Sequence, residues 1–263
     1  MKYLNSRNRA ILREMISSDF KVRYQGSVLG YAWSLLRPLF LFAVLYVVFV
    51  YIIPLGKDVE HFPVYLLTGV ILWNFFAEAT TQGSLAIVSR GELIRKISIP
   101  RYLLVISSSV SALINLGLSL VVLVMFAIIN GVTPGFQWLL VFPLIIEIFI
   151  FTLGISFLLS TLYVKFRDIS YIWEVFLQVG FYASAIIFPL SSVPVKYHAF
   201  LFLNPIVQII QDARYLLATQ SSVTIWSAIH SFTIFIPFAI IALVVAIGGL
   251  YFKRRSKYFA EDI

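Results

Sequence analysis

Basic residues are distributed very unevenly along this chain. Seventeen of the twenty lysines and arginines fall in four short segments, residues 1–37, 84–101, 164–168 and 253–263. The alternating segments 54–62, 130–137 and 189–230 hold only Lys57, Lys196 and Arg214. Short cytoplasmic loops of membrane proteins keep an excess of positive charge. The pattern therefore predicts that both termini are cytoplasmic and that the chain crosses the membrane an even number of times.

Composition supports a membrane protein. The 263 residues are 60% hydrophobic and only 12% charged, with a mean hydropathy of +0.94. A soluble domain would be roughly a quarter charged. We therefore expect a single transmembrane domain over residues 1–263, with no separate soluble catalytic domain. The net charge of +8 follows from the basic flanks of apolar runs, so it does not indicate nucleic-acid binding.

Six apolar segments have the length of about 20 residues that a membrane-spanning helix needs. Because lipid cannot satisfy open backbone groups, and because no strands of alternating polarity are present, we expect an all-α fold. The predicted spans are residues 33–53, 64–86, 102–129, 138–164, 169–188 and 231–252. Spans one to five thus occupy 33–188.

The N-terminal segment, residues 1–32, has the pattern of an amphipathic helix. Its apolar side chains share one face, which consists of Ile11, Leu12, Met15, Ile16 and Phe20. The opposite face is basic and polar and consists of Arg9, Arg13, Ser17 and Lys21. Such a helix lies in the membrane interface with its basic face toward lipid phosphates. Two interpretations stay open, a simple anchor and a helix that also docks a cytoplasmic partner.

The region before the last span, residues 189–222, does not fit a plain crossing. Residues 195–203 and 206–217 are apolar but too short to span the bilayer. Asn204 and Pro205 separate them, and proline disfavours helix at its own position and at the one before. We expect a re-entrant pair of short helices on the outer side. A surface loop with one amphipathic helix is the alternative.

Catalytic and nucleotide-binding motifs are missing from the sequence. The three histidines are far apart, and no phosphate-binding glycine loop is present. We therefore expect a non-enzymatic chain with no cofactor or metal site of its own; any use of ATP requires a separate subunit. Three carboxylates, Glu78, Glu147 and Glu174, fall inside predicted spans, where charges are costly. A structural role and a pathway role both stay open for them.

Aromatic side chains recur along spans one and five. Aromatic faces can pack against the C–H faces of sugar rings, although for any single ring lipid contact or core packing is the favoured explanation. The candidate path residues are Phe40, Tyr46, Phe49, Trp173, Phe176 and Tyr182.

The inner loop between spans two and three predicts a handle for a cytoplasmic protein. Gly91 and Pro100 bracket a short stretch of mixed charge whose Leu93, Ile94 and Ile97 form an apolar stripe. A purely connecting loop would not need an amphipathic helix bounded in this way.

Four motifs in order resemble the membrane subunits of type-2 ABC exporters for polysaccharides, O-antigens and teichoic acids, across essentially the whole chain. They are DFKVRYQGSVLGYAWSLLRP at 19–38, ELIRKISIPR at 92–101, FRDI at 166–169, and LNP at 203–205 followed by Arg214. Arg37 stands where that family commonly carries Asn.

The resemblance implies the following roles. Two copies of the chain form a channel lined by spans one, two and five, and each copy docks on a separate ATP-binding cassette subunit that holds ATP and Mg²⁺. A lipid-linked glycan enters from the inner leaflet of a bacterial or archaeal cytoplasmic membrane. The implied residues are Glu92, Leu93, Ile94, Arg95, Lys96, Pro100 and Arg101 for coupling; Arg167 and Asp168 for the inner turn; Arg23 and Arg37 for the lipid phosphate; and Asn204 and Pro205 for the re-entrant break.

Three other functions compete with this interpretation. A type-2 permease for a drug or a lipid shares the six spans, but the Arg-Asp turn and the Asn-Pro segment favour a glycan exporter. An ATP-independent channel or secondary carrier is a second alternative. A membrane-embedded glycan polymerase is a third, although it should place several acids, histidines or arginines at the outer face, where this chain has few.

Overall fold

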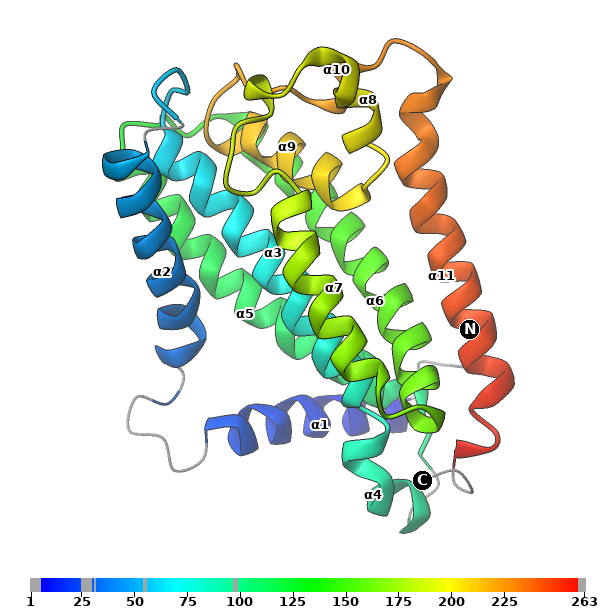
Figure 1. Ribbon diagram of the computed structural model, residues 1–263. Coiled ribbons are helices and arrows are strands. Elements are labelled where there is room, and N and C mark those ends of the chain that lie inside the picture. Colours follow the sequence, from blue (N-terminus) through cyan, green and yellow to red (C-terminus); the bar gives the residue numbers. More distant parts are fainter. Residues whose placement is uncertain (1–5, 25–29, 31, 54–55, 97–98, 260–263) are drawn as a thin grey trace.

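The computed structural model describes residues 6–24, 30, 32–53, 56–96 and 99–259 (Figure 1). The described part is helical and contains no strand. Its long helices run side by side, short helices cap one end of this bundle, and α1 lies across the other end. The expectation of an all-α chain is therefore confirmed.

Within the described residues, four helices are long and apolar enough to cross a membrane. They are α3 (Phe62–Leu85), α5 (Tyr102–Ile129), α6 (Val141–Lys165) and α11 (Ile236–Arg255). A 3-10 turn leads into each of the last two, over Phe136–Leu140 and Phe232–Phe235. These helices cover the predicted spans two, three, four and six.

Predicted spans one and five are built differently. Helix α2 (Ala32–Tyr46) contains Pro38 and continues as a π-helical segment, Val47–Ile52. Helix α7 (Ile169–Ala183) has 15 residues and ends before the expected 188. Beyond its end, Ala185 has a φ of 50°, and the carbonyls of Ala185 and Ile186 accept hydrogen bonds from Arg214 of a later helix.

Helix α3 forms the centre of the bundle (Figure 1). Seventeen of its residues are buried, and it packs against α2, α5, α6, α7 and α9. By contrast, no residue of α7 is fully buried. One side of α7 packs partly against the core through Trp173, Leu177 and Phe181, while Ile172, Phe176 and Val179 are exposed. A bundle whose apolar side chains face outward needs lipid or another protein surface around it. The fold is therefore that of a multi-pass membrane protein.

The cap at one end consists of α8 (His198–Leu201), α9 (Pro205–Leu217) and α10 (Ile225–Ala228). The expected helix over 195–203 is wrong in detail, since a 3-10 turn, Val195–Tyr197, precedes a helix of only four residues. Helix α9 begins at the expected Asn204-Pro205 break. The side chain of Asn204 accepts a hydrogen bond from the Ile206 N–H at 3.0 Å and so caps the helix.

The opposite end carries α1 (Ser6–Tyr24) and α4 (Gly91–Lys96). Met15 of α1 is buried in one apolar cluster with Ile87 and Leu104, which fits the predicted apolar stripe of this helix. The basic ends of α6 and α11 lie at this same end (Figure 1). The described basic segments of the sequence thus gather on one side of the bundle.

Candidate functional site

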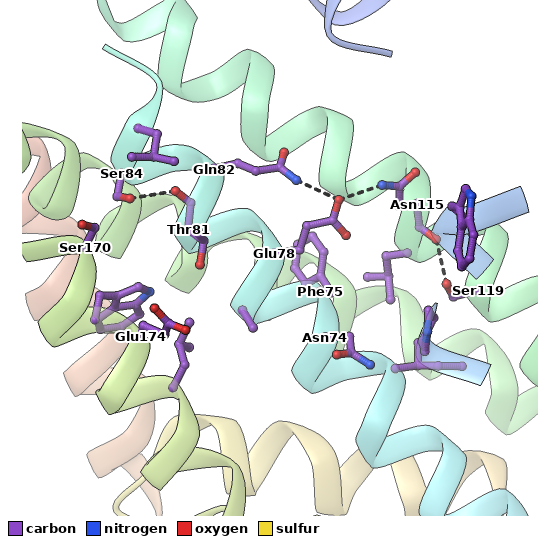
Figure 2. A pocket seen from close by; sticks show the side chains of 18 of the residues that line it. Asn74, Phe75, Glu78, Thr81, Gln82, Ser84, Asn115, Ser119, Ser170 and Glu174 are labelled. Carbon is purple, nitrogen blue, oxygen red and sulfur yellow. Dashed lines mark hydrogen bonds between the residues drawn. The ribbon is translucent and has the colours of Figure 1, made fainter. Parts of the chain in front are cut away.

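A cavity of about 770 Å³ opens between α2, α3, α5 and α7 (Figure 2). Its lining includes Leu85 near the end of α3 and Ser170 near the start of α7. Both positions are close to the end of the bundle that carries α1 and α4. The cavity therefore lies in the half of the bundle nearest the basic segments.

One face of α3 supplies most of the wall. Asn74, Glu78 and Gln82 follow one another at intervals of four residues, so they project from the same side of the helix. Asn115 and Ser119 of α5 and Glu174 of α7 add further polar groups. This convergence of polar side chains within an apolar bundle marks the cavity as the candidate site.

Hydrogen bonds fix Glu78 in this wall. The side-chain amides of Gln82 and Asn115 both donate to Glu78 Oε1, each at 2.8 Å (Figure 2). The bond from Asn115 joins α3 to α5. Among the described residues, Glu78 thus accepts from a donor on its own helix and from one on the neighbouring helix.

Aromatic rings complete the lining. Trp33, Phe75, Tyr171 and Trp173 line the cavity together with the polar groups. The Trp173 indole N–H donates to Thr80 Oγ1 at 3.0 Å, which joins α7 to α3. The combination of flat apolar faces with carboxylate and amide groups suits a ligand that has both hydroxyls and C–H faces.

Most of the predicted path aromatics lie elsewhere. Trp173 is the only one of the six that lines the cavity. Phe40, Phe176 and Tyr182 are exposed on the outside of the chain, whereas Tyr46 and Phe49 pack partly against the main core. The sequence analysis named Glu78 but not the two amides that flank it on α3, Asn74 and Gln82. Their four-residue spacing from Glu78 within an apolar span could have indicated them.

The predicted handle is a short helix on the outside of the bundle. In α4, the side chains of Glu92, Arg95 and Lys96 are exposed, while Leu93 and Ile94 pack against the apolar cluster around Met15. Pro100 follows this segment, and Arg101, at the start of α5, donates to the carbonyl of Ser256. The helix thus presents charges outward and is anchored by its apolar face.

Arg90, just before α4, was not among the predicted site residues. Its guanidinium forms an ion pair with Asp19 of α1, and it donates to Ser107 Oγ at 3.1 Å and to the Leu104 carbonyl at 3.4 Å. Arg90 therefore connects α1, the start of α4 and α5. Asp19 and Arg90 are 71 residues apart, so no local pattern could have paired them.

The predicted inner turn between α6 and α7 is exposed. Arg167 lies over the ring of Tyr163, 5.3 Å from its centroid. The carbonyl of Asp168 accepts hydrogen bonds from the N–H groups of Tyr171 and Ile172, while its side chain makes no capping bond. The turn is held by backbone bonds and by this stacking.

Arg214 of α9 is fully buried and joins the cap formed by α8, α9 and α10 to the bundle. It donates to the carbonyls of Tyr65, Ala185 and Ile186 at 3.0, 2.7 and 2.7 Å. Its guanidinium also stacks on the ring of Tyr65 at 3.7 Å. The Asn204 side-chain amide donates to Ser184 Oγ at 3.1 Å and so adds a second hydrogen-bonded contact between α9 and the segment that follows α7.

The remaining candidates are placed as follows. Glu174 lines the cavity, whereas Glu147 on α6 does not; its Oε1 atom is buried without a hydrogen-bond partner among the described residues. The side chains of Arg23 and Arg37, the predicted phosphate-binding residues, lie outside the described part of the structure.

The chain is a multi-pass helical bundle with a polar cavity between its helices and the exposed short helix α4 at its basic end. This is the architecture of a membrane transporter. The chain belongs to the ABC-2 type transporter family, which matches residues 12–218. The resemblance inferred from the sequence motifs is therefore confirmed.

Three curated relatives illustrate the similarity. An O-antigen export system permease protein RfbA of Klebsiella pneumoniae is 29% identical over 253 residues, which are 95% of this chain and 94% of that protein. A protein of the same name from Myxococcus xanthus is 30% identical, over 84% of this chain and 90% of its own length. The polysialic acid transport protein KpsM of Escherichia coli is 24% identical over 74% and 76%.

Proposed function

We propose that this chain is the channel-forming permease subunit of an ATP-driven exporter that moves lipid-linked polysaccharide across the cytoplasmic membrane. The family membership and the polysaccharide permeases among its relatives support this function. The observation that carries it is the cavity, where aromatic rings and hydroxyl-binding side chains meet inside a membrane bundle. O-antigen, capsular glycan and teichoic acid are the substrates of this type.

The proposed topology has six crossings, with α2 and its π-helical extension as the first and α7 as the fifth. Both termini are cytoplasmic, because the basic segments gather at one end of the bundle. In this orientation α1 lies along the inner interface and the cap around α9 is a re-entrant outer region. The cavity then opens in the cytoplasmic half, where a lipid-linked glycan would enter.

Two copies of the chain and two ATP-binding cassette subunits would make up the exporter. The exposed apolar faces of α2 and α7 are the proposed contact between copies, because large apolar side chains such as Phe40, Phe176 and Tyr182 lie there uncovered. ATP and Mg²⁺ would bind to the partner subunit. Arg23 and Arg37 are proposed to attract the phosphate of the lipid carrier near the inner surface.

Coupling between ATP hydrolysis in the partner subunit and transport through this chain would be transmitted by the contacts around α4. Its exposed charges Glu92, Arg95 and Lys96 would dock on the ATPase subunit, and its movement would reach α1 and α5 through Arg90. Ser107, which accepts from Arg90, lies about two helical turns from Asn115 on the same helix. Closure of the ATPase dimer would in this way move a wall of the cavity.

Deletion of the gene tests this function. We expect surface glycan to disappear and lipid-linked glycan to accumulate on the cytoplasmic side, and the tagged chain to copurify with an ATPase subunit. Complementation with the double variant Glu92→Ala, Arg95→Ala should leave insertion intact but fail to restore export. Normal surface glycan in the deletion strain, or a copurified complex without an ATPase, would refute the exporter.

A further inference from the structure

A second cavity, of about 470 Å³, lies at the end of the bundle that carries α1 and α4. It is bounded by the start of α5, the second half of α6 and the last turns of α11. Among the described residues, it shares no lining residue with the larger cavity between α2, α3, α5 and α7. The proposed transport path therefore does not account for this second cavity.

An open apolar wall forms one side of it. The rings of Phe157 on α6 and Phe252 on α11 pack with their centroids 4.8 Å apart. Gly249 lies three residues before Phe252, on the same face of α11. A Cβ atom built at Gly249 would meet nothing within 4 Å, so the space beside this glycine is open to a hydrocarbon chain.

Two cations line the same cavity. Lys253 of α11 is exposed, and Arg101 at the start of α5 is half-buried. The Arg101 guanidinium donates to the Ser256 carbonyl, its one hydrogen bond in the described part of the chain, so most of its five N–H donors are left for a ligand. Neither cation forms an ion pair with a described acid, and no described lining residue is an aspartate or a glutamate.

A positive rim beside an apolar wall suits an anionic phospholipid. In the proposed orientation this end of the bundle faces the cytoplasmic leaflet, where basic pockets between membrane helices bind acidic headgroups. The phosphodiester would accept charge-assisted hydrogen bonds from Arg101 and Lys253, while an acyl chain would cover the apolar wall. A zwitterionic lipid suits the site less well, because its own cation would meet the like charges of the rim.

We propose that this cavity binds one anionic phospholipid of the inner leaflet, through its phosphodiester at Arg101 and Lys253 and through an acyl chain beside Gly249. Of the proposed function, the site uses only the orientation of the chain in the membrane. Residues 99–101 line the cavity and lead from α4 into α5. The bound lipid would therefore border the connection behind the helix that is proposed to dock on the ATPase subunit.

Native mass spectrometry of the full-length chain, purified with its ATPase partner, gives the first test. The probes are dioleoylphosphatidylglycerol, which is anionic, and dioleoylphosphatidylcholine, which has the same acyl chains and is zwitterionic. The anionic lipid should bind at least about tenfold more tightly. Equal binding, or tighter binding of the zwitterionic lipid, would overturn the proposal. Displacement of the anionic lipid by inorganic phosphate alone would show a site for free anions and would overturn it as well.

The lipid preference can fail independently of the exporter function. A chain that copurifies without an ATPase subunit would contradict the exporter, but its preference for the anionic lipid could still be measured on the chain alone. An intact exporter without this preference would refute the lipid site and leave the proposed function unchanged.

Matched variants locate the binding. Lys253→Gln should reduce the preference to less than about threefold, whereas Lys257→Gln, the same change four residues further on and outside the lining, should retain it. Gly249→Leu would fill the space for the acyl chain and should weaken binding of the anionic lipid about tenfold. Gly117→Leu is its control, because a Cβ at Gly117 of α5 also meets nothing within 4 Å and Gly117 does not line the cavity. An unchanged preference in Lys253→Gln, or equal losses in a variant and its control, would refute the site.

Discussion

Asp19 and Arg90 form an ion pair that joins α1 to the residue immediately before α4. Both side chains are largely buried, with 17% and 21% of their surfaces exposed. Arg90 also donates to Ser107 and Leu104 of α5. One guanidinium therefore links the N-terminal helix, the proposed ATPase handle and a helix that lines the cavity.

Loss of this ion pair should uncouple transport from ATP hydrolysis. We expect Arg90→Gln to lower glycan export several-fold while the ATPase activity of the purified complex is retained, because the handle would no longer be tied to α5. Loss of the charged hydrogen bonds should also lower the free energy of unfolding by about 1–3 kcal/mol. Export and ATP hydrolysis would be measured on the same preparations.

The reversed pair provides the control for this prediction. Asp19→Arg combined with Arg90→Asp restores opposite charges and should recover part of the export that either single change loses. Loss of the ATPase activity itself in Arg90→Gln, or full export with it, would contradict the coupling role.

Arg214 should be essential for the stability of the cap formed by α8, α9 and α10. Arg214→Lys keeps the charge but cannot reach the carbonyls of Tyr65, Ala185 and Ile186 together, so buried acceptors lose their donors. We expect a loss of about 3–5 kcal/mol, typical of a broken buried charge network. Thermal unfolding in detergent, followed by size-exclusion chromatography, would measure it.

Arg167→Lys is the matched control, because Arg167 is exposed at the opposite end of the bundle. Its melting temperature should lie within about 2 °C of that of the parent chain, because surface substitutions change the free energy of unfolding by no more than about 0.5 kcal/mol. Equal melting of Arg214→Lys and the parent chain would show that the three carbonyl contacts do not support the cap.

Close packing of α6 and α11 depends on two glycines. A Cβ atom built at Gly248 would lie 2.2 Å from the Gly154 carbonyl oxygen, so the helices approach each other backbone to backbone. Gly248→Leu should therefore separate the helices and reduce the yield of folded, monodisperse protein severalfold. Fluorescence-detected size-exclusion chromatography reads this out directly.

Gly249→Leu is an unusually close control, since it makes the same change one residue along the same helix where a Cβ would meet nothing within 4 Å. It should be tolerated. Comparable damage from both substitutions would mean that the close packing of Gly248 against α6 is not what limits folding, because leucine favours a helix more than glycine does at either position.

The hydrogen bond from Trp173 to Thr80 should position α7 against the cavity. Trp173→Phe keeps an aromatic ring but removes the indole donor, so Thr80 Oγ1 loses a partner. The expected cost is about 1 kcal/mol of stability, with a larger effect on export than on insertion. Thr80→Val removes the other partner and should resemble Trp173→Phe. The double variant should cost less than the sum of the two single changes, and a cost equal to or above that sum would contradict a shared bond.

Much of the fold could be predicted from the sequence. The lengths of the apolar segments predicted the bounds of α3, α5, α6 and α11 to within a few residues. This works because a membrane-spanning helix requires a continuous run of apolar residues, which is a local property of the sequence. The predicted helix break at Asn204 and Pro205 was also confirmed, because proline restricts the backbone at its own position and at the preceding residue in any context. The end of α7 was missed, and the carbonyls just beyond it accept hydrogen bonds from Arg214, which lies about thirty residues further along the chain.

The sequence by itself determined the membrane class, the positions of the long helices, the presence of the short charged helix α4 and the family of the chain. These features follow from composition, periodicity and short motifs. The tertiary structure decided which polar groups meet: Asn115 with Glu78, Arg90 with Asp19, and Arg214 with the carbonyls beyond α7. Hydrogen bonds act over about 3 Å, and only the packing of helices brings groups that are distant in the sequence within that range.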